Sequence, residues 1–283
     1  MIYLMFAMKV EAEPFLNKLS LKKLSDKPFE IYEDESKNVK IAISGIGKVN
    51  IAGATSYLLK DIISPIFNYE DFIFNIGICG SLNDKYKISE AVLCNKIKDY
   101  ETKKNFYSDI LIEHPLKEGA IQSIYNLDQK YEFLEDLVDM EASAFFQVAS
   151  KFLYTHQIYV LKIVSDYIDK INQLNVKKLP KNFIKSLIET NIEPIFVLLK
   201  NIHYLLKSNP PLIQKKDIEI IENFSRYLNL TFTQKEQLKN AYFYAKSRKI
   251  EPLKILEKYV KITPENKYER NIIFENVKNE FYK

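Results

Sequence analysis

Three acidic residues, far apart in the chain, stand where their side chains could take part in acid–base chemistry. Glu11 follows a short apolar segment, Glu141 opens a predicted helix, and Asp166 ends a second apolar run. Because the apolar segments predict strands, all three carboxyl groups are expected at one edge of a sheet. Carboxyl groups gathered there could exchange protons with a bound molecule and stabilise positive charge on it. Taken singly, each has a structural explanation, since acidic residues also favour helix starts and turns.

Glycine is scarce and clustered, which marks a second candidate feature. Of six glycines, five fall within 36 residues: Gly45, Gly47, Gly53, Gly77 and Gly80. The segment Ser-Gly-Ile-Gly-Lys at 44–48 joins a predicted strand to a predicted helix, so its backbone amides could face an anion or a sugar. It is not a dinucleotide fingerprint, because position 50 is Asn50, and a phosphate-binding loop needs a longer spacer before its Gly-Lys. A plain tight turn is the alternative.

The elements that must position these residues alternate between strands and helices in the first part of the chain. Strands are expected at residues 2–6, 29–32, 39–44, 72–76, 91–97, 120–124 and 158–164. Helices are expected at residues 10–19, 49–59 and 141–153. Strands separated by helices predict an α/β fold, with a mixed, mostly parallel central sheet flanked by helices. In such sheets ligands bind at the carboxyl ends of the strands.

From residue 183 onward the apolar spacing is helical only. One long helix, or a helix broken at Pro194, is predicted over about 183–206, and the Asn-Pro-Pro run at 209–211 ends it. Amphipathic helices are expected around residues 218–228, 234–246, 251–260 and 268–281. We therefore expect two domains, an α/β domain at 1–208 and a small all-α C-terminal domain at 209–283.

Composition excludes several classes of protein and site. Two cysteines and three histidines without ligand spacing argue against a metal site. No apolar run reaches the roughly 18 residues of a membrane helix, and no basic stretch precedes residues 1–7, which predicts a cytoplasmic protein without membrane attachment. Residues 209–283 carry 15 basic and 10 acidic side chains, but because these are interspersed a nucleic-acid partner is not favoured.

The order of the motifs is similar to that of a known family. The segments that carry the likeness are Ala7-Met8 with Glu11, the glycine segment at 44–48, Asn75-Ile76-Gly77-Ile78-Cys79-Gly80, Asp139-Met140-Glu141-Ala142 and Val164-Ser165-Asp166. In this order, over residues 1 to about 208, the chain resembles the nucleoside phosphorylase superfamily. Within it, the likeness is to 5′-methylthioadenosine/S-adenosylhomocysteine nucleosidases. The Met-Glu-Ala and Ser-Asp motifs are the more specific part, whereas the glycine motifs alone are weak.

The resemblance implies a role for each acidic residue. Glu11 is similar to the base that activates water, Glu141 with Met140 to the ribose contacts, and Asp166 to the acid that assists protonation of purine N7. Cleaving an N-glycosidic bond builds positive charge on the ribose, and the departing purine needs a proton, so carboxyl groups suit the reaction. An acid that donates near neutral pH needs a pKa raised by burial. The other expected substrate contacts are Gly45, Ile46, Gly77, Ile78, Ser165, Lys162 and, as a stacking residue for the purine, Tyr125.

Two positions depart from the family pattern. Lys162 stands where an arginine is usual, and Ile78 stands where a serine is usual. Both usual residues help to position water in the nucleosidases, so these changes bear on the rate of hydrolysis. The segment between Gly80 and Met140, which normally supplies the base pocket and part of the dimer contact, is also shorter than usual.

The expected function is hydrolysis of a 5′-modified adenine nucleoside, such as 5′-methylthioadenosine, S-adenosylhomocysteine or 5′-deoxyadenosine, with release of adenine and without any cofactor. Phosphorolysis is less favoured, because no arginine precedes Arg226 and Lys48 alone cannot form a bidentate clamp. The resemblance implies a homodimer, and the C-terminal helices are a candidate docking element for a protein partner. The alternative is a nucleoside-binding or scaffold protein with weakened catalysis, which Lys162 and Ile78 favour and the acidic residues oppose.

Overall fold

The computed structural model describes residues 1–62, 70–126, 132–168, 179–208 and 212–283. The chain divides into two compact units, Met1–Ser208 and Asn209–Lys283, each of which is considered by itself. The helix stop expected at 209–211 lies outside the described residues. Within the described part of the chain, no helix has both the length and the apolar character needed to cross a lipid bilayer.

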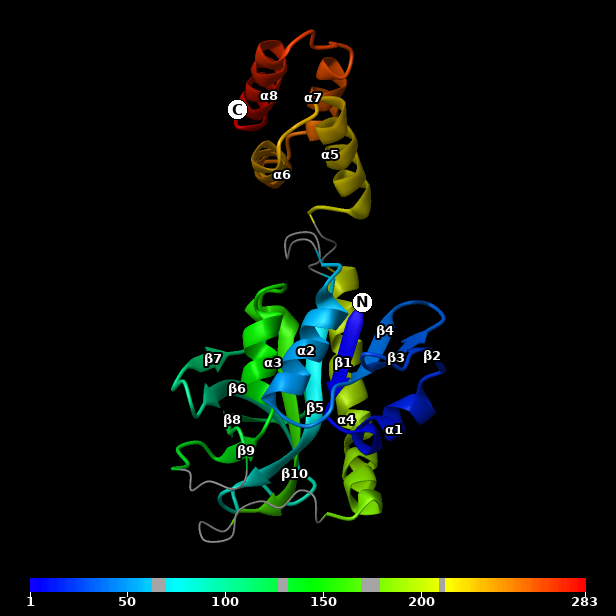
Figure 1. Ribbon diagram of the computed structural model, residues 1–283, viewed down its shortest axis with the longest axis vertical. Helices are drawn as coiled ribbons and strands as arrows, with labels where there is room; N and C mark the ends of the chain where they lie inside the picture. The colour runs from blue at the N-terminus through cyan, green and yellow to red at the C-terminus, as the bar shows by residue number, and fades with distance from the viewer. Residues whose placement is uncertain (63–69, 127–131, 169–178, 209–211) are drawn as a thin grey trace. The chain divides into compact units, whose positions relative to one another are not determined.

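The first unit is built on one sheet, whose strands are labelled in Figure 1. The strands are β1 (Ile2–Phe6), β2 (Leu21–Ser25), β3 (Glu30–Asp34), β4 (Val39–Ile43), β5 (Phe72–Ser81), β6 (Ala91–Asp99), β7 (Asn105–Tyr107), β8 (Lys117–Ser123), β9 (Leu137–Asp139) and β10 (Ile158–Tyr167). Their order is β10-β6-β8-β9-β5-β1-β4-β3-β2, with β7 beside β6. Because β10 also pairs with β5, the strands β10, β6, β8, β9 and β5 form a closed cycle of pairings.

The sheet is mixed. Parallel pairs join β1 to β4 and β5, β5 to β10, and β8 to β6 and β9. Antiparallel pairs join β2 to β3, β3 to β4, β5 to β9, β6 to β7, and β6 to β10. The α/β class with a mixed sheet is therefore confirmed, whereas a predominance of parallel pairing is not, since the two kinds are equally common among the described strands.

Helices cover both faces of this sheet. They are α1 (Lys9–Lys18), α2 (Lys48–Leu59), α3 (Ala142–Ala149) and α4 (Lys181–Ser208), close to the expected ranges, and Pro194 lies inside α4. Helices α2 and α3 contribute to one apolar cluster with one face of the sheet, and α1 and α4 contribute to a second cluster with the other face. Figure 1 shows α2 and α3 side by side, in front of β5 and β10.

Three strands were not expected from the sequence, and several others are longer than expected, β5 by the most. The strands β2, β7 and β9 had no clear signal, because β2 is polar and largely exposed and the other two have three residues each. Strand β5 was expected to end at residue 76 but runs on through Gly77 and Gly80, since β10 pairs with this part of it. The glycine-containing motif at residues 75–80 is thus part of a strand.

The second unit contains the helices α5 (Lys215–Tyr227), α6 (Phe232–Ser247), α7 (Pro252–Tyr259) and α8 (Lys267–Phe281), as the spacing predicted. Apolar side chains on all four are buried, among them Phe224, Leu238, Leu256 and Phe274. The start of α6 is capped by the Thr231 hydroxyl, which accepts a hydrogen bond from the Gln234 amide.

Candidate functional site

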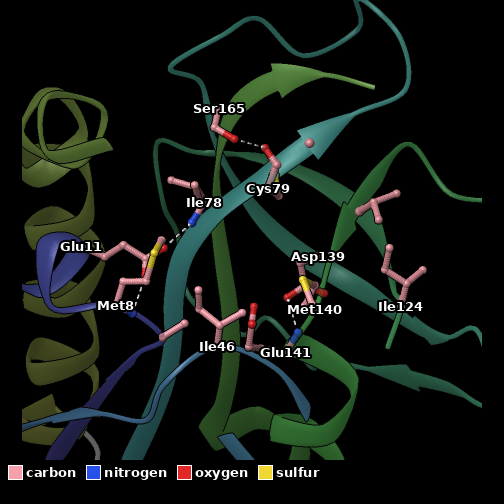
Figure 2. Close-up of a pocket in the computed structure, with 13 residues that line it drawn as sticks. Met8, Glu11, Ile46, Ile78, Cys79, Ile124, Asp139, Met140, Glu141 and Ser165 are labelled. Atoms are coloured by element: carbon pink, nitrogen blue, oxygen red, sulfur yellow. Dashed lines mark hydrogen bonds between the residues drawn. The ribbon is translucent and has the colours of Figure 1, made fainter. Parts of the chain in front are cut away.

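A cavity opens where six strands of the first unit end. Its lining comes from the segments that follow β1, β4 and β8, from β9 and the two residues after it, and from the last parts of β5 and β10. The space measures about 440 Å³ when the part open to solvent is included. Most of the lining is apolar, with two glutamates and one aspartate among it, as Figure 2 shows. A mostly apolar pocket with a few convergent polar groups is typical of a small-molecule site.

Glu11 reaches the cavity from the first turn of α1, directly after β1. It is 2% exposed, and both carboxyl oxygens accept backbone hydrogen bonds: Oε2 from the Met8 amide at 2.9 Å and Oε1 from the Ile78 amide at 3.0 Å (Figure 2). Burial raises the pKa of Glu11, while Lys162 and the backbone donors act in the opposite direction. The carboxyl group is therefore held in one orientation on one wall.

Glu141 enters from the N-terminus of α3, where it is the N-cap residue. Its Oε1 accepts a hydrogen bond of 2.8 Å from the Gly47 amide, the last residue before α2. Gly47 has a φ of +98°, which glycine adopts without strain. The sequence suggested that amides of this segment could face an anion or a sugar; the Gly47 amide binds the Glu141 carboxyl group. Burial raises the pKa of Glu141 to about 7, although Lys162 opposes this shift.

Lys162, on β10, is a buried cation among three carboxyl groups. Its Nζ lies 2.9 Å from Asp139 Oδ2 and 3.9 Å from Glu141 Oε2, and its side chain is 1% exposed. Burial lowers the pKa of Lys162, but Asp139, Glu141 and Glu11 outweigh burial and raise it. Lys162 therefore carries a fixed positive charge beneath the site.

Asp139 is the partner that holds this lysine. Its Oδ2 also accepts the backbone amides of Glu141 at 3.2 Å and Ala142 at 2.8 Å, and its Oδ1 accepts the Ser123 hydroxyl at 2.5 Å. Asp139 belongs to the Asp-Met-Glu-Ala motif at 139–142, but it was not predicted as a site residue. Its position directly before Met140 and Glu141 was the available signal.

Gly77 borders both Glu11 and Lys162. A Cβ placed on Gly77 would lie 2.9 Å from Glu11 Oε1 and 3.5 Å from Lys162 Nζ. The carboxylate and the ammonium group therefore both border the position that a Cβ would take, and a side chain there would displace the Glu11 carboxylate. The contribution of Gly77 to the site is the space that it leaves.

Asp166 lies beside the cavity rather than in its lining. A β-bulge in β10 places Val164 opposite Cys79 and Asp166 opposite Gly80, so that Ser165 is the extra residue. The Ser165 hydroxyl lines the cavity and is in hydrogen-bonding contact with Asp166 Oδ1 and the Cys79 carbonyl oxygen. Burial raises the pKa of Asp166, with the Ser165 hydroxyl opposing.

The other expected contacts divide into two groups. Of all the predicted catalytic and substrate-contact residues, those that line the cavity are Glu11, Ile46, Ile78, Met140, Glu141 and Ser165. Gly45, whose amide donates to the Ala7 carbonyl at 3.0 Å, lies outside the lining, as do Gly77 and Lys162. Tyr125 is 54% exposed and also lies outside the lining, whereas its neighbour Ile124 is part of it. The stacking role of Tyr125 stays a prediction.

Lys48, the cation next to the glycine segment, is already engaged. Its Nζ lies 2.5 Å from Asp99 Oδ2, contacts Glu101, and reaches the Ser123 carbonyl oxygen at 3.4 Å. The side chain is 11% exposed. It is therefore committed to these acceptors rather than presented to the cavity. Among the described residues, no group of three or more His, Cys, Asp or Glu side chains is arranged to hold a metal ion.

Solved structures show which fold the chain has. The chain matches a 5′-methylthioadenosine nucleosidase from Arabidopsis thaliana with a TM-score of 0.57 and 18% identity, over 71% of this chain and 95% of that one. It matches the 5′-methylthioadenosine/S-adenosylhomocysteine nucleosidase of Neisseria meningitidis, in complex with methylthio-immucillin-A, with a TM-score of 0.57 and 21% identity, over 70% and 98% of the two chains.

A third match is the futalosine hydrolase of Helicobacter pylori, with a TM-score of 0.53 and 19% identity, over 70% of this chain and 97% of that one. No protein-family model and no curated protein sequence matches the chain. The resemblance stated from the motifs is thus confirmed at the level of the fold. The matched share is close to the first unit, 208 of 283 residues, so the helical second unit is an addition to that fold.

Proposed function

We propose that this protein hydrolyses the N-glycosidic bond of a 5′-modified adenine nucleoside and releases adenine. The substrates we favour are 5′-methylthioadenosine, S-adenosylhomocysteine and 5′-deoxyadenosine. The observation that carries the proposal is the meeting of Glu11 and Glu141 in one cavity, with Lys162 behind them. Solved nucleosidases of the same fold add support.

Glu141 is the proposed sugar-binding group. Its Oε1 is oriented by the Gly47 amide, and a ribose hydroxyl would donate to the carboxylate from the cavity side. As the bond between C1′ and the purine breaks, positive charge develops on the ribose. Preorganised carboxylates in a water-poor site stabilise that charge more strongly than water does.

Glu11 is the proposed base. The carboxylate takes a proton from a water molecule while the water oxygen forms a bond to C1′. Two backbone amides hold Glu11, and Lys162, which also borders Gly77, favours its ionised form. The electron pair of the broken bond passes to the purine. Asp166, whose pKa is raised by burial, is the proposed source of the proton that N7 receives.

Water rather than phosphate is the proposed second substrate. A phosphorylase of this kind needs cationic side chains that clamp a phosphate. Lys48 is bound to Asp99 and Glu101, and Lys162 is bound to Asp139. No organic cofactor or metal ion is part of the proposal. We carry the homodimer as a proposal from the resemblance, and light scattering of the purified protein tests it.

The decisive experiment follows free adenine and sugar by chromatography after incubation with each of the three nucleosides, with and without phosphate. We expect adenine and the free sugar, at a rate that phosphate does not change. Asp166→Asn should abolish release, whereas Asp84→Asn, at an exposed aspartate outside the cavity, should not. Undiminished turnover of Asp166→Asn would remove Asp166 from the mechanism, and a sugar phosphate product would replace hydrolysis by phosphorolysis.

A second candidate is a nucleoside-binding or scaffold protein with weakened catalysis. Ile78 lines the cavity with an apolar side chain where the family pattern has a serine, and Lys162 replaces an arginine, so fewer groups are available to orient water. Calorimetric titration with the same nucleosides separates the candidates. Binding without adenine release would favour the binding protein.

A further inference from the structure

A row of three polar side chains, Asp99, Ser123 and Asp139, crosses the ends of β6, β8 and β9 and reaches the cavity lining at Asp139. The register of the sheet pairs Asp99 at the end of β6 with Ser123 at the end of β8, and Ser123 with Asp139 at the end of β9. All three are buried. Ser123 Oγ donates to Asp139 at 2.5 Å and accepts the Ser143 amide at 2.9 Å. The row therefore ends at the aspartate that holds Lys162.

Asp99 binds the starts of both helices that meet at Glu141. Its Oδ2 lies 2.5 Å from Lys48 Nζ and accepts the Ser143 hydroxyl at 2.6 Å. Lys48 is the first residue of α2 and follows Gly47, whose amide binds Glu141. Ser143 is the second residue of α3, whose N-cap is Glu141. One carboxylate thus ties together the two helix ends between which the Glu141 side chain is held.

Asp99 itself is outside the cavity lining and is firmly anchored. Its Oδ1 accepts the amide and the hydroxyl of Thr102, each at 2.8 Å. Burial acts to raise the pKa of Asp99, but the hydrogen bonds from Lys48, Ser143 and Thr102 outweigh it and lower that pKa to about 2. Asp99 is therefore an anion over the whole working range of pH.

We propose that Asp99 is a positioning residue for the sugar-binding glutamate: by joining Lys48 to Ser143 it sets the distance between the starts of α2 and α3, and so the orientation of Glu141 toward the ribose hydroxyls. The inference rests on the proposed function for its kinetic consequence. Its structural consequence, the hydrogen bond between the Gly47 amide and Glu141, is independent of any activity.

The test compares Asp99→Asn with Glu101→Gln. Glu101 also contacts Lys48, but its side chain is more exposed, and its other oxygen accepts the Tyr125 amide, whereas the Ser143 hydroxyl donates to Asp99. Asn preserves the shape of Asp99 and removes the charge.

For a nucleoside with both sugar hydroxyls, Asp99→Asn should raise KM about tenfold, with a smaller change in kcat. The coupling energy between residues that share hydrogen-bond partners is typically of this size. For the analogue of the same nucleoside that lacks the 2′ and 3′ hydroxyls, the KM of Asp99→Asn should equal the KM of the wild type. Glu101→Gln should behave as the wild type with both substrates.

A second readout does not depend on turnover. Asp99→Asn should speed hydrogen exchange of the Gly47 amide about tenfold relative to Glu101→Gln. If Asp99→Asn does not fold, Ser143→Ala, which removes only the α3 side of the link, takes its place in both measurements. A KM increase of equal size with both substrates, or an unchanged Gly47 exchange rate, would overturn the inference. If the wild type releases no adenine, the proposed function fails, while the exchange measurement still decides the role of Asp99.

Discussion

Replacing Gly77 with alanine is the most direct perturbation of the proposed water-activating group. Gly77 has no left-handed backbone requirement, so the only change is the added methyl group. That methyl carbon would lie 2.9 Å from Glu11 Oε1 and 3.4 Å from Glu11 Cδ, and ordinary contact begins near 3.4 Å. Glu11 must therefore retreat by about 0.5 Å, the difference between 3.4 and 2.9 Å.

The retreat has consequences for stability and for rate. It strains the 3.0 Å hydrogen bond from the Ile78 amide to Glu11, and a hydrogen bond to a buried charged group contributes roughly 1.5–3 kcal/mol. For a unit of this size we expect Tm to fall by about 3–12 °C. A displacement approaching 1 Å can cost about 100-fold in rate, so we expect kcat to fall by about 10- to 100-fold. KM should change little, because Glu141 is not displaced.

The assay measures Tm by circular dichroism, and kcat and KM by adenine release. Gly53→Ala is the matched control, because Gly53 lies inside α2 and a Cβ there would meet only Phe29 Cζ, at 3.4 Å. Alanine is preferred over glycine inside a helix by about 1 kcal/mol, so this control should be as stable as the wild type or more so, with unchanged kcat. Wild-type Tm and kcat in Gly77→Ala would refute the placement of Glu11 beside Gly77.

Three further substitutions test the surrounding structure. Gly119→Ala places a Cβ 2.4 Å from the Tyr86 hydroxyl oxygen. Urea denaturation should therefore show a free energy of unfolding lower by about 1–3 kcal/mol, with kcat unchanged. A lowered kcat would count against a purely structural effect. Lys162→Met leaves Asp139 and Glu141 buried without their cation and should lower the free energy of unfolding by about 3–5 kcal/mol in the same measurement. Lys162→Arg keeps the positive charge and should retain most of that free energy. Burial raises the pKa of Glu141 to about 7, so its contribution to stability is complete at low pH and is lost as pH rises through about 7. Relative to the wild type, Glu141→Gln should therefore be more stable at about pH 8 than at about pH 5 in thermal denaturation, and a difference that does not change with pH would contradict the raised pKa.

The sequence predicted the elements that carry the site better than the contacts within it. Strands β1, β5 and β10 were predictable because each is mainly apolar, with one polar residue inside the predicted part of β5 (Asn75) and of β10 (Lys162), which is typical of strands buried on both faces. Strand β2 was not, because its polar side chains face solvent and its pairing depends on β3. The continuation of β5 through Gly77 and Gly80 depends likewise on pairing with another strand.

Within the site, long-range contacts limited prediction. The motifs predicted that Glu11, Glu141 and Asp166 would meet at one site; Glu11 and Glu141 line the cavity, whereas Asp166 lies outside its lining. The ion pair between Asp139 and Lys162 could not be predicted, because it joins β9 to β10 and depends on the faces that these strands present. For the same reason the row that begins at Asp99 has no signal in the sequence: its members are adjacent only through the register of three strands.

The bulge at Ser165 makes the spacing of the Ser-Asp motif depend on strand geometry as well as on residue type. In a regular strand, neighbouring side chains point to opposite sides of the sheet, so Ser165 and Asp166 could not touch. With one extra residue the two side chains meet beside the cavity. Deleting or inserting a single residue in the last part of β10 would exchange the sides for every position after the change. Loop grafts and chimeras of this protein should therefore preserve the length of β10 at its carboxyl end, even where they change its side chains.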